Sequence, residues 1–334
     1  MLRSLCLLIL VLPFTSLQAA QDNGCERWLL PKPRVAQSAD YNENTGLHIA
    51  MIGDSTVRDF YLSSALSSFW QLWTKNQNNA FLSTVPKNGI ESVYQKVSRL
   101  GAVKATEHSR AGARVETRLG FFTRFKLRLL NIKPLDAQVA EALRSKRLAD
   151  LILLWMGNNN MDFAAQSNTS TTELRRRFVE SYRHSLLALI ARARLKPEKT
   201  AIVVYGMINA AATTKARADA RFAQSRDATL YPYLKKGDQR FPSMRAEHVD
   251  ELVRLSQEMS ADLERLVFEL QHETAAHPQV LLTYSDATQR ADLSDPRLYH
   301  HVDAWHLSVA GKNAIADALY QGAHSGLDFL GFKP

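Results

Sequence analysis

The sequence predicts an α/β protein built on a mainly parallel β-sheet. Two observations indicate this fold class: short apolar runs with the length of buried strands, and amphipathic segments of helical period between them. The strand candidates cover residues 47–52, 102–106, 149–156, 200–207 and 280–285, and the helix candidates cover 56–73, 90–100, 136–147, 172–196, 246–277 and 308–321. Strands that alternate with helices in this way form parallel sheets with right-handed crossovers.

Local signals support several of these elements. The run ADLILLWM at 149–156 is almost continuously apolar, as expected for a parallel strand covered on both faces. The basic helix predicted over 172–196 stops before Pro197, and Ser308 suits the N-cap of the last helix. A strand or an ordered loop is expected at 81–85.

The domain organisation is predicted from the segments outside the expected strands and helices. Residues 1–20 have a basic start, an apolar run and a small-residue end, which predicts a signal peptide. Residues 21–45, with Pro31 and Pro33, predict an N-terminal arm, and residues 46–334 form a single domain. The stretch 209–245 is expected to be irregular, which in a compact domain indicates a functional lid or a disordered insertion.

The composition and the predicted signal peptide limit the classes of function that this protein can have. We expect a secreted or periplasmic protein, with an uncleaved anchor as the alternative, and no transmembrane segment after signal removal. Removal of Cys6 with the signal leaves Cys25 without an intrachain partner. The net charge of +9 favours an anionic surface or polysaccharide as partner. Nucleic acid is not expected, because no zinc-finger spacing, RNA-recognition signature or phosphate-binding glycine loop is present.

A segment at 110–134 interleaves arginines and lysines with phenylalanines and leucines. Such a segment can lie against anionic lipid or polysaccharide. The favoured alternative is an ordinary amphipathic element, with its apolar side in the core and its basic side chains in water.

Gly53, Asp54 and Ser55 follow the first predicted strand of the domain, and Ser55 is a candidate nucleophile. A hydroxyl at the carboxyl end of a strand lies where open α/β sheets bind their ligands. The N–H groups of the next helical turn can also face a developing negative charge. Ser55 therefore suits nucleophilic attack, and the alternative is an ordinary turn with a capping Ser55 or Asp54.

A candidate base stands just before the last predicted helix, where Asp303 and His306 are three residues apart. At this spacing Asp303 can accept a hydrogen bond from the imidazole and fix its tautomer. The other ring nitrogen of His306 is then able to accept the proton of an attacking hydroxyl. The alternative is an ordinary surface pair.

Four short blocks resemble, in the same order, those of the SGNH hydrolase superfamily, the GDSL-type esterases and lipases. They are Ile52-Gly53-Asp54-Ser55, Ser109-Arg110-Ala111-Gly112, Gly157-Asn158-Asn159, and Asp303 to His306 with Leu307-Ser308 and Gly311. The resemblance runs from about residue 47 to 319 and implies a flavodoxin-like, three-layer α/β/α sandwich. It implies that Ser55 is the nucleophile and that Asp303 and His306 are its acid and base partners.

The same resemblance implies an oxyanion hole made by the N–H groups of Ser55 and Gly112 and by the side chain of Asn159. Two positions depart from the family pattern. Asn160 stands where the family usually has an acidic residue, and no asparagine precedes Gly112.

The resulting prediction is a serine esterase that hydrolyses carboxylic esters through an acyl-enzyme; its substrate is an acylated glycan, a lipid or a small ester. One alternative is O-acyl transfer or deacetylation on a cell-surface or secreted polysaccharide, and another is a glycan-binding module without turnover. No cofactor and no metal are expected, since the ten histidines show no ligand spacing and His300-His301 flank the predicted site.

Overall fold

The computed structural model describes residues 34–54, 89–109, 113–115, 133–161, 170–225, 249–299 and 307–334. The predicted signal peptide, the helix expected at 56–73, the element expected at 81–85 and most of the basic segment 110–134 lie outside these residues. In the described part of the chain, no helix is long and apolar enough to cross a bilayer.

A six-stranded sheet has the order β1-β3-β2-β4-β5-β6. Its strands are β1 (Arg34–Gln37), β2 (Leu47–Gly53), β3 (Val103–Glu107), β4 (Leu151–Trp155), β5 (Thr200–Tyr205) and β6 (Val280–Ser285). All neighbours from β3 to β6 run parallel, whereas β1 pairs antiparallel with β3 at the edge. The predicted parallel sheet is therefore confirmed, and every residue of β2, β4 and β5 is buried as expected for strands covered on both faces.

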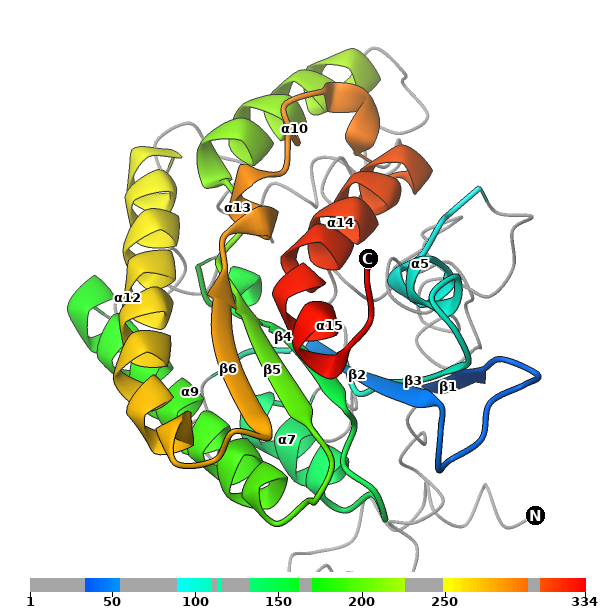
Figure 1. Ribbon diagram of the computed structural model, residues 1–334. Coiled ribbons are helices and arrows are strands. Elements are labelled where there is room, and N and C mark those ends of the chain that lie inside the picture. Colours follow the sequence, from blue (N-terminus) through cyan, green and yellow to red (C-terminus); the bar gives the residue numbers. More distant parts are fainter. Residues whose placement is uncertain are drawn as a thin grey trace, which may run out of the picture. The chain divides into compact units, whose positions relative to one another are not determined.

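Helices cover both faces of this sheet (Figure 1). On one face lie α7 (Leu135–Leu143), α9 (Thr171–Arg194) and α12 (Val249–Ala275), and on the other lie α5 (Val93–Ser98), α14 (Val309–Gly322) and α15 (His324–Leu330). The three-layer α/β/α prediction is confirmed. Among the parallel strands the order is that of the flavodoxin-like fold: the chain passes from β2 to β3 and then returns across β2 to β4. The carboxyl ends of β2 and β4 therefore flank the switch point, where such folds bind ligands.

The short helices α13 (Ala287–Arg290) and α15 were not predicted, and two longer segments differ from their predictions. The expected N-terminal arm contributes β1, which the sequence does not reveal because its four residues contain no apolar run. The expected irregular stretch at 209–245 begins as the helix α10 (Ala210–Ser225), since alanines and basic residues there are good helix formers. Asn209 starts this helix by accepting the Ala212 N–H at 3.2 Å. The rest of the stretch, from residue 226, lies outside the described residues.

A buried polar cluster lies at the amino ends of the strands, away from the switch point. Asp150 accepts the N–H of His48 at 2.8 Å and pairs with Arg147 at 3.1 Å and with Lys196. The ring of His48 lies 2.8 Å from the hydroxyl of Thr106, and burial lowers the pKa of His48 to about 4. His48 is therefore neutral at pH 7 and has a structural role.

Candidate active site

The first element of the site is the end of β2. Asp54, next to Gly53, is fully buried. The Gly53 N–H donates to Gln138 Oε1 at 3.0 Å, and Gln138 Nε2 donates back to the Gly53 carbonyl at 3.0 Å. A side chain of α7 thus fixes the peptide that leads to Asp54. Ser55 itself lies outside the described residues.

The end of β4 is fixed in a similar way from α9. The hydroxyl of Tyr182 donates to the Met156 carbonyl at 2.6 Å and accepts the Met156 N–H at 3.1 Å. Gly157 follows with a φ of 136°, and a Cβ there would lie 2.7 Å from Phe178 and 2.8 Å from Met207. Only glycine fits this turn, which leads directly into the helical turn of residues 158–161.

Asn158 joins three strand ends at the switch point. Its Nδ2 lies 3.4 Å from Asp54 Oδ2, and its Oδ1 accepts the Ile208 N–H, just beyond β5, at 3.2 Å. The contact to Asp54 places the third sequence block against the first. No role of its own was predicted for Asn158 from the sequence, so its bridging role was missed.

Asn159 and Asn160 hold the chain that follows the second block. Asn159 Nδ2 donates to the Ala113 carbonyl at 3.0 Å, and the buried Asn160 Oδ1 accepts the Val115 N–H at 3.0 Å. An amide nitrogen carries two hydrogens, so the bond to Ala113 leaves a second donor for the predicted oxyanion role of Asn159. Asn160 also supplies an acceptor of the kind that an acidic residue would provide at this position.

The second block begins in a cluster of buried polar side chains at the end of β3. The Ser109 hydroxyl donates to the Glu107 carboxylate, and the His108 N–H donates to the Met51 carbonyl at 2.8 Å. His108 Nδ1 lies 3.5 Å from the carboxylate of Glu141 on α7. The cluster links the second block to the helix that carries Gln138. Gly112, the predicted oxyanion donor, lies outside the described residues, one position before Ala113.

Of the terminal block, the structure describes only the part from Leu307 onward. Tyr299 and Leu307 form an antiparallel bridge, and the Ser308 N–H donates to the Leu298 carbonyl at 2.8 Å. The predicted cap is confirmed, because Ser308 Oγ accepts the Gly311 N–H at 3.3 Å at the start of α14. The bridge between Tyr299 and Leu307 joins the residues on either side of 300–306, which include Asp303 and His306 and lie outside the described residues.

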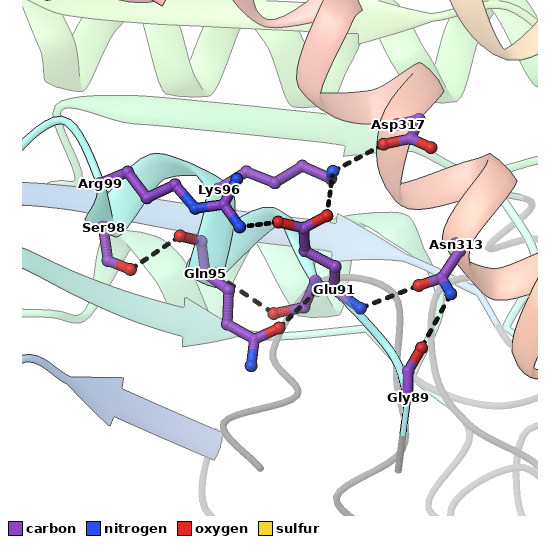
Figure 2. Close-up of polar contacts among 9 residues, drawn as sticks. Gly89, Glu91, Gln95, Lys96, Ser98, Arg99, Asn313 and Asp317 are labelled. Carbon is purple, nitrogen blue, oxygen red and sulfur yellow. Dashed lines mark hydrogen bonds and ion pairs between the residues drawn. The ribbon is translucent and has the colours of Figure 1, made fainter. Parts of the chain in front are cut away.

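A polar contact between α5 and α14 links the segment after the predicted nucleophile to the helix after the predicted base (Figure 2). Asn313 on α14 accepts the Glu91 N–H at 2.8 Å and donates to the Gly89 carbonyl at 2.8 Å. Lys96 bridges Glu91 at 3.1 Å and Asp317 at 2.6 Å. The hydrogen bond from Lys96 lowers the pKa of the Glu91 carboxyl. Residues 89–96, which follow the stretch 55–88 in the sequence, are therefore fixed to α14.

The structure thus joins parts of two predicted blocks, Asp54 with Asn158, and it joins Asn159 to Ala113, the residue after the second block. The roles of Ser55, Gly112, Asp303 and His306 stay predictions. Sequence reasoning missed Gln138 and Tyr182, which act on backbone groups from helices. Within the described residues, no group of three or more His, Cys, Asp or Glu side chains is placed to hold a metal ion.

No model of a known protein family and no curated protein matches the chain. Among solved structures, a lipase, Lip_vut3, from a goat rumen metagenome is similar with a TM-score of 0.40 and 14% identity over 83% of this chain and 97% of its own. The protein YxiM from Bacillus subtilis is similar with a TM-score of 0.37 and 14% identity over 84% of this chain and 56% of its own. Any functional assignment therefore rests on the residues of this chain.

Proposed function

We propose that this protein is a serine-dependent hydrolase of carboxylic esters, with Ser55 as nucleophile, His306 as base and Asp303 as the partner that orients the imidazole. Acyl transfer needs a nucleophile, an oriented base and donors aimed at the oxyanion, all held at one edge of the sheet. The contact between Asn158 and Asp54, 3.4 Å long at the switch point, is the observation that supports this proposal most strongly.

That contact supports the proposal because Asp54 precedes Ser55 directly and Asn158 precedes Asn159 directly. Two segments about a hundred residues apart in the chain thus lie side by side where flavodoxin-like folds bind ligands. The bond from Asn159 to Ala113 brings the residue next to Gly112 to the same place. The bridge between Tyr299 and Leu307 joins the two residues that flank 300–306, the stretch with the predicted acid and base.

In the proposed reaction, Ser55 Oγ bonds to the ester carbonyl carbon while its proton moves to a ring nitrogen of His306. The carbonyl electron pair moves onto oxygen, where the N–H groups of Ser55 and Gly112 and the amide of Asn159 stabilise it. The tetrahedral intermediate expels the alcohol, which takes the proton from His306. Water then attacks the acyl-enzyme by the same route and releases the acid.

The predicted signal peptide at residues 1–20 and the net charge of +9 extend the proposal to the location of the enzyme and to its binding partners. We infer that the enzyme works after export, as a secreted or periplasmic protein. Its excess positive charge favours an anionic surface or polysaccharide near the ester substrate.

A panel of chromogenic esters of increasing acyl length tests the proposed reaction. We expect turnover by the wild-type protein and its loss in Ser55→Ala and in His306→Gln. Product that forms only when a sugar acceptor is added would replace hydrolysis by acyl transfer. Glycan binding without turnover in either assay would overturn the enzyme proposal.

A further inference from the structure

The side chain of Gln138 is fully buried on α7, and its amide bonds to three backbone groups. Oε1 accepts the Gly53 N–H, and Nε2 donates to the carbonyls of Gly53 and Lys133, each at 3.0 Å. Both amide hydrogens are therefore used. The two bonds to Gly53 form a closed pair like the pair that a neighbouring strand would make.

The position of this pair explains why it is needed. The β2 to β3 register ends at Met51 and Glu107, and the last ladder bond runs from the His108 N–H to the Met51 carbonyl. In a parallel sheet, the N–H and C=O groups of every second residue face the same edge. Gly53, two residues after Met51, therefore faces the edge that β3 has already left, and Gln138 takes the place of the missing strand.

The other edge of β2 remains paired with β4, where Gly53 stands opposite Trp155. The last peptide of β2 is thus held from both sides immediately before Asp54. A buried amide that bonds to both groups of one residue restricts the rotation of that peptide. It therefore fixes the direction in which the chain enters Asp54.

We propose that Gln138 is a positioning residue for the nucleophile. This inference rests on the proposed function, because it assigns to Gln138 the task of holding Gly53 so that Ser55 meets its base. Gln138 reaches the reacting atoms through the backbone and has no contact with substrate. A misplacement of about 1 Å of a reacting group can cost roughly a hundredfold in rate.

The test measures the rate at which a fluorophosphonate probe labels the full-length protein, together with kcat and KM on the best ester of the panel. Gln138→Met keeps the length of the side chain and removes all three bonds. We expect labelling and kcat to fall about tenfold or more while KM stays within about twofold, because alignment is lost and substrate binding is kept. Hydrogen exchange of the peptide that contains Gly53 should become faster.

Gln138→Glu provides the conservative variant. A protonated glutamic acid can accept the Gly53 N–H and donate to the Gly53 carbonyl, whereas its carboxylate can only accept. Burial raises the pKa of such a carboxyl. The labelling rate of Gln138→Glu relative to wild type should therefore rise as the pH falls from 8 to 6. Circular dichroism must show the variant folded at both pH values, because ionisation of its buried carboxyl would also lower stability.

Tyr205→Phe is the matched control. It removes a buried hydroxyl that donates to the Leu319 carbonyl at 2.6 Å, away from the end of β2. We expect this variant to label at the wild-type rate. Gln138→Met that labels like wild type would overturn the positioning role. Failure of the wild-type protein to label would overturn the proposed function, and the inference with it.

Discussion

Tyr182 should be one of the most sensitive single hydroxyls in the protein. Tyr182→Phe removes one oxygen atom and leaves the ring, which packs with its centroid 4.9 Å from that of Phe178. The lost hydroxyl serves both backbone groups of Met156, at 2.6 Å and 3.1 Å. The change therefore deprives two buried polar groups of a partner without creating a large cavity.

The expected loss of stability follows from the number of backbone groups that lose a partner. A buried backbone group that loses its partner costs about 1–3 kcal/mol, so the two groups of Met156 together should lower the free energy of unfolding of Tyr182→Phe by about 2–6 kcal/mol. Tyr205→Phe makes the same chemical change, but the Leu319 carbonyl keeps the Ala323 N–H as a donor at 3.1 Å. That variant should cost only about 1 kcal/mol.

Urea denaturation of the two variants beside wild type measures the difference, with tryptophan fluorescence as the signal. Labelling by the fluorophosphonate probe should also slow in Tyr182→Phe, because Met156 leads through Gly157 to Asn159. Equal costs for the two variants would refute the reasoning that Tyr182 holds the end of β4. A large cost with unchanged labelling would refute its link to the site.

Three further predictions concern separate parts of the structure. Gly157→Ala should lower the free energy of unfolding by about 2–4 kcal/mol, because the new Cβ meets Phe178 at 2.7 Å at a φ of 136°. In the same urea assay, Gly331→Ala should lower the free energy of unfolding by only about 1 kcal/mol. The φ of Gly331 is 91°, but a Cβ at this position would have no atom within 4 Å. Asn159→Ala should reduce kcat by about 10²- to 10³-fold with little change in KM, measured on the best ester. Burial lowers the pKa of His48 to about 4 from its usual 6.5, so the unfolded chain binds more protons between these values. Stability should therefore fall by up to about 3 kcal/mol as the pH drops from 7 to 4, and His48→Gln should flatten that dependence.

The central strands β2, β4 and β5 could be predicted because they are nearly continuous apolar runs. The prediction for 280–285 matches β6 exactly, and those for β2, β4 and β5 differ by one or two residues at the ends. The strand β1 lacks such a run, because it lies at the edge of the sheet and pairs with only one strand, β3. The helix α10 was missed because its alanines and arginines form no strong apolar stripe.

The candidate site could be predicted only where a residue follows a strand directly. Asn159 was singled out in this way, four residues after the end of β4, and its oxyanion role stays a prediction. Gln138 and Tyr182 lie in the middle of helices, and each bonds to the backbone of a strand far away in the chain. No spacing in the sequence reveals such a bond, because it depends on how the helix packs on the sheet. Gly157 offered a signal, since a glycine directly after a buried strand indicates a special backbone turn.

The most direct test of the central claim is mass-spectrometric mapping of the residue that the fluorophosphonate probe modifies. We predict that the modification lies on Ser55, that Ser55→Ala abolishes it, and that His306→Gln slows it. Modification of another residue, or labelling of Ser55→Ala at the wild-type rate, would contradict the claim that Ser55 and His306 act together at the end of β2.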